Sequence, residues 1–399
     1  MTFFIKALLF CTFSLQTIIF LPIGSTSNIG IAIIGCLLLL SKIDTRSSVK
    51  KTSLLPVALG VAALLIQLYY AAIDPKSTLS YLQFSFFVFA ATVVFLFGIR
   101  APTSRTIDSI SSAAKASFIL VFFVAFAQYA EHLATGGTTI FDLVSRHQIN
   151  DNFYIRNQIV SGNFRSIGPY YEPSYLAMMI LFFWTIISVA QKQKLFFYDF
   201  LLVCSAIIAS SFLLAAATFL LLTYKAIAGK KIKIKTLPIY IAAIPLFLGI
   251  AYFIADTTGY LNRLTEFQNE GSSAYFRLIA PLKIIQYVLF ERISPLPIGT
   301  LDSVLFQFGL VDEAGKTFDN GYYIVIANFS WLGVLLLTYL LFQLGNKIKE
   351  SMRISSIRGL IPLYAVILPL FNGLIFSPEF CLIVLTLIIL WKHSYDRRA

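Results

Sequence analysis

The chain has 399 residues, of which 58% are hydrophobic and 13% are Asp, Glu, Lys or Arg, and its net charge is +12. Its mean hydropathy is +0.81, and a soluble domain cannot bury so much apolar surface beneath so few charges. The composition excludes a soluble enzyme, a disordered chain and a nucleic-acid-binding domain, and it indicates that a bilayer surrounds most of the protein.

Apolar segments of the length that spans a bilayer as a helix recur along the whole chain. In chain order they lie at 3–22, 27–41, 54–72, 79–98, 113–131, 173–190, 196–209, 212–228, 237–255, 321–345, 359–375 and 379–392. We expect the first to be a retained helix, since no convincing small-residue cleavage site follows it. The pattern predicts a single all-α polytopic membrane domain over 1–399 with about 12 transmembrane helices.

The basic residues are divided unevenly between the two sides of these segments. Most of the 31 Lys and Arg residues fall on the side that holds both termini, and the other side is net negative. Cytoplasmic loops carry the excess of Lys and Arg, so we expect both termini to be cytoplasmic. The positive charge is then a signal of topology, and it implies no nucleic-acid partner.

Two long loops fall on the outer side, at about 132–172 and 256–320. Long loops of this kind are where function usually concentrates. Within the second loop the stretch 272–290 is apolar, but Arg277, Pro281 and Lys283 interrupt it. A thirteenth span is the alternative, and it would move the basic stretch 347–358 to the outer side. We therefore predict an interfacial helix near 272–290 whose lipid-facing residues are Leu278, Ile279, Leu282, Ile285 and Leu289.

The first candidate site ends the first outer loop. Glu172 precedes Pro173, which begins an apolar helix, and Arg165 lies seven residues upstream. An acid and a proline also suit a helix start, so a purely structural role for Glu172 stays open. In a functional role, Glu172 at the rim of a membrane cavity would act as a general base. The guanidinium of Arg165 fits phosphate oxygens, and we assign both residues to the catalytic set.

Further candidates follow on the same side. Arg277 in the second loop and Asp319 at its end complete the catalytic set, although snorkelling to headgroups would also account for Arg277 and helix capping for Asp319. The candidates for substrate binding are Arg263, Tyr171, Tyr275, Asn320, His147 and Glu379. The structural alternatives are helix capping for Asn320, a tight turn for Glu379 and an incidental loop position for His147.

Together these residues offer arginines, carboxylates and aromatic rings on the outer side. Arginines suit a diphosphate, while aromatic faces and carboxylates suit sugars. A substrate with a lipid tail, a diphosphate and an oligosaccharide satisfies all of these features. The chain has no Cys or His spacing typical of a metal site, so we expect neither a metal nor another cofactor.

Four segments carry a resemblance to a known family: EGSSAYFR at 270–277, GKTFDNG at 315–321, FSW at 329–331 and FSPE at 376–379. With the Glu172–Pro173 helix start, they make the chain similar to the bacterial polysaccharide repeat-unit polymerases (O-antigen and capsule polymerases), and most similar to the colanic acid polymerases among them. The resemblance spans most of the chain.

The resemblance implies a metal-independent glycosyltransferase of exopolysaccharide synthesis in the bacterial inner membrane, with its active site facing the periplasm. The implied substrate is an undecaprenyl-diphosphate-linked oligosaccharide, from which the growing chain is transferred to the next repeat unit. Family arginines match Arg165 and Arg277, with Arg263 as a further candidate, and the base stays open among Glu172, Asp319 and His147. Membrane lipid, the repeat-unit flippase and a chain-length regulator are the implied partners.

Two other functions remain as alternatives. A lipid-linked oligosaccharide flippase or transporter would place functional charges near the bilayer midplane, whereas these spans carry few charges at their centres. An O-antigen ligase is related to the same family but carries a functional histidine in its second large loop, and residues 256–320 contain none. We therefore favour a polymerase.

Overall fold

A computed structural model of the protein describes most of the chain. The described residues are 6–7, 9–10, 32–37, 39, 54–73, 78–97, 102–145, 164–170, 172–191, 196–209, 211–228, 275, 279–299, 301–309, 320–371, 373 and 375–396. Over these ranges the chain forms helices, turns and irregular connections, without any strand. The predicted all-α class is confirmed for this part of the protein.

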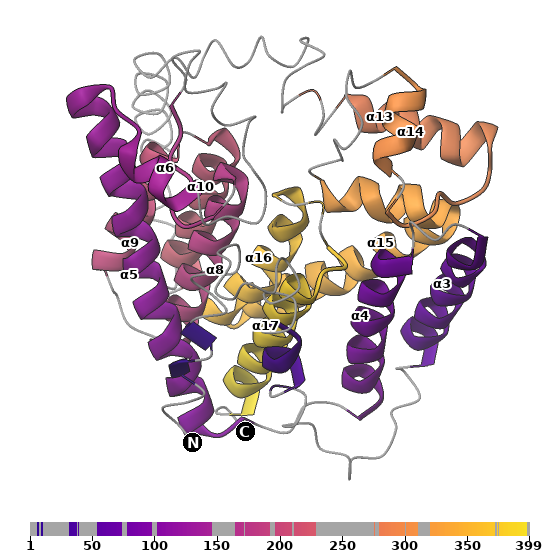
Figure 1. The fold of residues 1–399 in the computed structure, drawn as a ribbon. Helices are drawn as coiled ribbons and strands as arrows, with labels where there is room; N and C mark the ends of the chain where they lie inside the picture. Colours follow the sequence, from indigo (N-terminus) through magenta and orange to yellow (C-terminus); the bar gives the residue numbers. More distant parts are fainter. Residues whose placement is uncertain are drawn as a thin grey trace, which may run out of the picture.

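Helices of very different length make up the fold (Figure 1). They are α3 (Leu54–Ile73), α4 (Thr78–Phe97), α5 (Ser104–Thr135), α6 (Thr139–Ser145), α8 (Pro173–Gln191), α9 (Phe196–Ile208), α10 (Phe212–Ala228), α13 (Ala280–Gln286), α14 (Leu301–Gln307), α15 (Gly321–Arg353), α16 (Leu360–Ile367) and α17 (Pro378–Asp396). A π-helical turn, η6 (Tyr287–Glu291), continues α13, and two 3-10 turns, η7 (Ile357–Gly359) and η8 (Leu368–Leu370), flank α16.

The helices fall where the apolar segments predict them. Helices α5, α8 and α15 are each long and apolar enough to cross a membrane, and shorter apolar helices include residues of α3, α4, α9 and α10. The predicted segments 3–22 and 27–41 are described only in short pieces, and 237–255 lies outside the described residues. The count of about 12 spans therefore stays a prediction.

Helix α5 is longer at both ends than the predicted segment 113–131. Its first turn is capped by Thr103, whose hydroxyl accepts a hydrogen bond from the Thr106 N–H at 3.3 Å. It ends at Gly136, which has φ +65° and whose N–H donates to the His132 carbonyl at 2.8 Å, the left-handed end that glycine allows. The helix therefore continues through 132–135, which the sequence assigns to the first outer loop.

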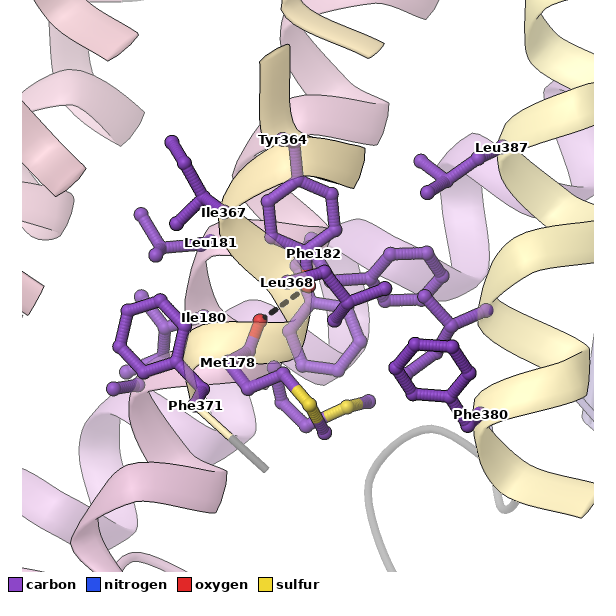
Figure 2. Close-up of a cluster of buried hydrophobic side chains, with 14 of the residues drawn as sticks. Met178, Ile180, Leu181, Phe182, Tyr364, Ile367, Leu368, Phe371, Phe380 and Leu387 are labelled. Carbon is purple, nitrogen blue, oxygen red and sulfur yellow. Dashed lines mark hydrogen bonds between the residues drawn. The ribbon is translucent and has the colours of Figure 1, made fainter. Parts of the chain in front are cut away.

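Helix α8 forms the centre of the molecule. Every residue from Ser174 to Val189 is buried, because α5, α9, α10, α16 and α17 all pack against it. Figure 2 shows part of this packing, a cluster of buried side chains that includes Phe182, Phe371 and Phe380, and within it the Tyr364 hydroxyl donates to the Met178 carbonyl at 2.8 Å. Since lipid tails are as apolar as these side chains, close packing and such hydrogen bonds hold the helices together.

The short helices lie at one end of this bundle. Helices α6, α13 and α14 are at the upper end in Figure 1, whereas the start of α5 and the end of α17 are at the lower end. Elements from both of the long loops that the sequence predicts therefore lie at the upper end, with α6 on the left and α13 and α14 on the right in Figure 1.

A partly buried ion pair ties three helices together away from that end. Lys225 of α10 and Asp199 of α9 are 2.5 Å apart, with side chains 12% and 24% exposed. The indole N–H of Trp184 in α8 donates to the same carboxylate oxygen at 2.8 Å, and the Lys225 ammonium lies 5.1 Å from the Trp184 ring centroid. The carboxylate is thus shared by a cation and an indole donor.

We expect Asp199→Leu to lower the free energy of unfolding by about 3 kcal/mol, because it leaves the Lys225 charge without its partner in a poorly solvated place. The double variant Asp199→Leu/Lys225→Met should recover most of the loss, since removing both charges is far less harmful than removing one. Thermal unfolding of the purified protein in detergent measures both. A double variant that unfolds earlier than Asp199→Leu would contradict this account.

Candidate functional site

The end of the first of the two predicted loops, residues 164–170, is hydrogen-bonded to α5 by one buried side chain. Gln128 is 1% exposed, and its Oε1 accepts hydrogen bonds from the N–H groups of Ile167 at 3.1 Å and Gly168 at 2.9 Å. Its Nε2 donates to the Gly168 carbonyl at 3.0 Å. Both ends of the Gln128 amide are therefore used to hold a single turn, which closes with a Tyr170 N–H to Ile167 carbonyl bond of 3.1 Å.

This turn requires a glycine. Gly168 has φ +60°, a region that side chains with a Cβ rarely adopt. A Cβ at this position would also come within 3.0 Å of a Leu176 methyl group. The turn is thus fitted both to Gln128 on one side and to the first turns of α8 on the other.

Two neighbours of Gln128 hold the other described parts of the loop. The carboxylate of Glu131 accepts hydrogen bonds from the N–H groups of Thr139 at 2.8 Å and Ile140 at 2.7 Å, at the start of α6. The His132 ring stacks on Phe164 with centroids 4.2 Å apart and planes 17° apart. The last two turns of α5 therefore carry both α6 and the segment 164–170.

Arg165 and Glu172, the two catalytic candidates of the first loop, lie on either side of this turn. Arg165 is half-buried directly after Phe164, and Glu172 is half-buried directly before α8. The Ser174 hydroxyl donates to Glu172 Oε2 at 2.9 Å, and the Glu172 carbonyl accepts the Leu176 N–H at 3.1 Å. The helix-start role that we considered for Glu172 is confirmed, and its catalytic role stays a prediction.

Two buried tyrosines flank Glu172 in the sequence. Tyr170 and Tyr175 are 0% and 5% exposed, with ring centroids 5.3 Å apart. Burial, followed by the nearby Tyr175 and Tyr364, raises the pKa of the Tyr170 phenol well above its ordinary value. Tyr170 therefore stays protonated at neutral pH and does not act as the base.

Glu379 lies within electrostatic range of one of these tyrosines, Tyr175. Glu379 stands in the first turn of α17, where the Ser377 hydroxyl accepts the Phe380 N–H at 3.2 Å and caps the helix. The structure therefore brings this substrate-binding candidate to the same end of α8 as Glu172.

Asn320 opens α15 as a cap. It is 4% exposed, and its Oδ1 accepts the Tyr322 N–H at 3.1 Å, so the capping alternative is confirmed. The Tyr322 hydroxyl donates to the Val366 carbonyl of α16, and α16 is joined to α8 by the Tyr364–Met178 bond described above. Helix α16 thus connects the start of α15 with α8.

Within the stretch 272–290, predicted to be an interfacial helix, the structure describes Tyr275 and residues 279–290, which include α13 and the start of η6. Tyr275 is 4% exposed, and the Lys283 ammonium lies 3.3 Å from its hydroxyl. Ile279 and Leu282 are exposed, as predicted, but Leu289 is only 9% exposed, so its predicted lipid-facing position is wrong. The π-helical turn η6 changes the helical register there, and Phe290 and Ile293 are exposed in place of Leu289.

Several candidates lie outside the described residues: Arg277, Asp319, Arg263, Tyr171 and His147. Their roles stay predictions. Conversely, Gln128 holds the first-loop turn and was not predicted. The signal in the sequence was an uncharged polar side chain inside an apolar segment, where burial demands a hydrogen-bond partner.

Comparison with known proteins gives a family model and a curated relative that both cover most of the chain. The family model of WcaD colanic acid polymerase matches residues 7–393. Over 366 residues the chain is 28% identical to a curated protein of Escherichia coli (strain K12) named "Putative colanic acid polymerase", and the match covers 87% of each chain. Every site residue discussed above lies within the matched range.

Proposed function

Because this chain belongs to the WcaD colanic acid polymerase family, we propose that it polymerises lipid-linked oligosaccharide repeat units at the periplasmic face of the bacterial inner membrane. The growing chain would leave its undecaprenyl diphosphate and join the next repeat unit. The observation that most supports this is the placement of Arg165 and Glu172 on either side of one rigid turn. A phosphate-binding cation and a carboxylate are the two groups that such a transfer requires.

In this proposal the arginines bind the leaving diphosphate. Arg165, with Arg277 from the second loop, neutralises the negative charge that develops as the bond between the anomeric carbon and the diphosphate oxygen breaks. The guanidinium groups then supply the charge that a metal ion would supply in other transferases. The flippase that delivers repeat units and a chain-length regulator are the partners we expect beside the lipid-linked substrate.

Glu172 acts as the base. The acceptor hydroxyl oxygen attacks the anomeric carbon, and its proton passes to the Glu172 carboxylate. Glu172 Oε2 accepts the Ser174 hydroxyl at 2.9 Å, a contact that orients the carboxylate. One base and a direct displacement predict inversion at the anomeric carbon, by analogy with single-displacement glycoside chemistry.

The decisive experiment is polymerisation by the purified protein of one defined lipid-linked repeat unit, followed as a ladder on gels. A ladder that needs no added protein or metal supports the proposal. Cells that lack the protein should accumulate single repeat units on the outer side of the membrane. Accumulation on the inner side would instead indicate a flippase, and long polymer without its final lipid would indicate a ligase.

We expect Arg277→Ala to shorten the polymer to a few units and Arg277→Lys to restore only part of it. A lysine supplies one charge but not the two parallel donors of a guanidinium. Gel analysis of polymer length in cells, with membrane levels of each variant matched to the wild type, measures the effect. Full-length polymer from a well-expressed Arg277→Ala protein would remove this arginine from the mechanism.

A further inference from the structure

A second group of buried amides holds a segment that belongs to the second outer loop. Gln67 of α3 is 1% exposed. Its Nε2 donates to the carbonyls of Leu296 at 3.1 Å and Asn328 at 2.5 Å, and its Oε1 accepts the Ile298 N–H at 2.9 Å. The Nδ2 of Asn328 in α15, also 1% exposed, donates to the same Leu296 carbonyl at 3.1 Å.

The segment 295–298, Pro-Leu-Pro-Ile, is not helical, and four of its backbone groups bond to neighbouring helices. The Leu296 N–H donates to the Ala327 carbonyl at 2.9 Å, and the Tyr70 hydroxyl donates to the Pro295 carbonyl at 2.9 Å. The two prolines have no N–H to satisfy. Irregular backbone between membrane helices is tolerated only where protein or water meets its polar groups, and here α3 and α15 do so.

The backbone on both sides of this contact is strained. A π-helical turn, η6, precedes the segment, and Ile293, a β-branched residue, has φ +54°. Opposite it, α15 is kinked at Ser330, with φ +52° and ψ −134°. The kink lets the Ser330 hydroxyl and the Trp331 indole donate to the carbonyls of Val288 at 3.3 Å and Leu289 at 3.1 Å.

Strain of this kind persists only where surrounding contacts determine the conformation, and it is frequent at functional sites. A simple turn between two spans needs none of it. These hydrogen bonds also lie near the residues that the structure describes toward each end of the second loop, Tyr275 and Asn320. The segment 295–298 continues from α13 and η6, which follow Tyr275, and Asn328 lies two turns along α15 from Asn320.

We propose that Gln67 and Asn328 are positioning residues of the polymerase. They fix 295–298, and through η6 and α13 they fix Tyr275, whose carbonyl accepts the Ile279 N–H at 2.8 Å, relative to the start of α15. The proposal rests on the proposed function. Gln67 then does for the described part of the second loop what Gln128 does for the first: an amide from a neighbouring membrane helix holds an irregular segment of backbone.

The test compares Gln67→Leu, Asn328→Leu and the milder Gln67→Asn in the purified full-length protein. A small displacement of reacting groups lowers rates by about 100-fold, so we expect kcat/KM for the lipid-linked repeat unit to fall about 100-fold in the two Leu variants. Gln67→Asn keeps the amide and should fall less. The double Leu variant should fall little further, because both residues belong to one network.

A second readout follows the segment itself. Arg292 is exposed just before 295–298, so the Leu variants should be cut by trypsin after Arg292 faster than the wild type. The control is Thr185→Val in α8, which removes a fully buried hydroxyl that bonds to no residue the structure describes. It should keep wild-type kinetics and cleavage.

The outcomes separate the two proposals. Folded Gln67→Leu and Asn328→Leu proteins with wild-type kcat/KM, or with reduced kcat/KM but unchanged cleavage after Arg292, would overturn the positioning role. If the Leu variants do not fold, Gln67→Asn decides the same question. Failure of the wild type to polymerise would reject the proposed function, and the cleavage rates would still test whether the amides hold the segment.

Discussion

Glu172→Gln reduces the polymerisation rate at least about 100-fold, if Glu172 is the base, because a positioned base contributes about 100- to 10,000-fold. The substitution is close to isosteric. A glutamine carbonyl still accepts the Ser174 hydroxyl that now donates to Glu172 Oε2 at 2.9 Å, so the start of α8 is preserved, but an amide does not take up the proton. The rate is measured with a defined lipid-linked repeat unit and purified protein.

Two variants separate catalysis from helix capping at this position. Glu172→Asp keeps a carboxylate and should retain measurable activity, whereas Ser174→Ala removes the hydroxyl contact and should lower activity only moderately. Thermal unfolding should place Glu172→Gln close to the wild type. Wild-type polymerisation by Glu172→Gln would exclude Glu172 and leave Asp319 and His147 as the remaining candidates for the base.

Gln128→Leu is expected to abolish polymerisation through the loss of the first-loop turn. The change leaves the N–H groups of Ile167 and Gly168 and the Gly168 carbonyl without the amide that now binds them. Each buried group without a partner costs about 1–3 kcal/mol, so the turn loses several kcal/mol and no longer holds Arg165 and Glu172 in place. Polymer ladders and thermal unfolding, measured on the same preparation, report both losses.

Gln128→Glu provides the matched comparison. It keeps an oxygen for the two N–H groups but loses the donor to the Gly168 carbonyl, so its activity and stability should lie between those of the wild type and Gln128→Leu. Gly168→Ala tests the turn from the other side, since φ +60° and the 3.0 Å approach to Leu176 disfavour a Cβ. A Gln128→Leu protein with normal stability and normal polymer ladders would contradict the role of Gln128 in holding this turn.

The sequence predicts the helices well where apolar runs are long and uninterrupted. Helices α3, α4, α8 and α10 begin and end within one or two residues of the predicted segments, since a bilayer fixes the length of such runs. The extra turns at the start of α5 were missed because Arg105 and Asp108 lower the apolarity of residues 104–112. Its true limits are set by local capping at Thr103 and Gly136.

Irregular helices were beyond prediction. The orientation assumed for Leu289 depends on regular helical spacing, and η6 breaks that spacing. The kink of α15 at Ser330 has no proline within it. The kink requires a glycine at position 333, because a Cβ there would lie 2.5 Å from the Val325 carbonyl oxygen. Glycines are frequent within membrane helices, so a glycine in an apolar run does not by itself predict such a close contact.

The site was predictable in part. Arg165 and Glu172 are close in the sequence, so their proximity to one turn follows from the chain itself. The amides that hold the loops are far from their partners: Gln128 is about 40 residues from Gly168, and Gln67 is more than 220 residues from Leu296. Pairing across such separations depends on how the helices pack, which composition and periodicity do not specify.

The enclosure of α8 has a consequence for how the protein is made. Helix α8 leaves the ribosome long before α16 and α17, yet both of these helices pack against it and help to bury it. During synthesis the centre of the bundle is therefore open to lipid on one side until the C-terminal helices insert. The enclosure of α8 is complete only once α16 and α17 have inserted, so ribosome stalling or a stop codon before α16 would leave an unfinished bundle for quality-control proteases.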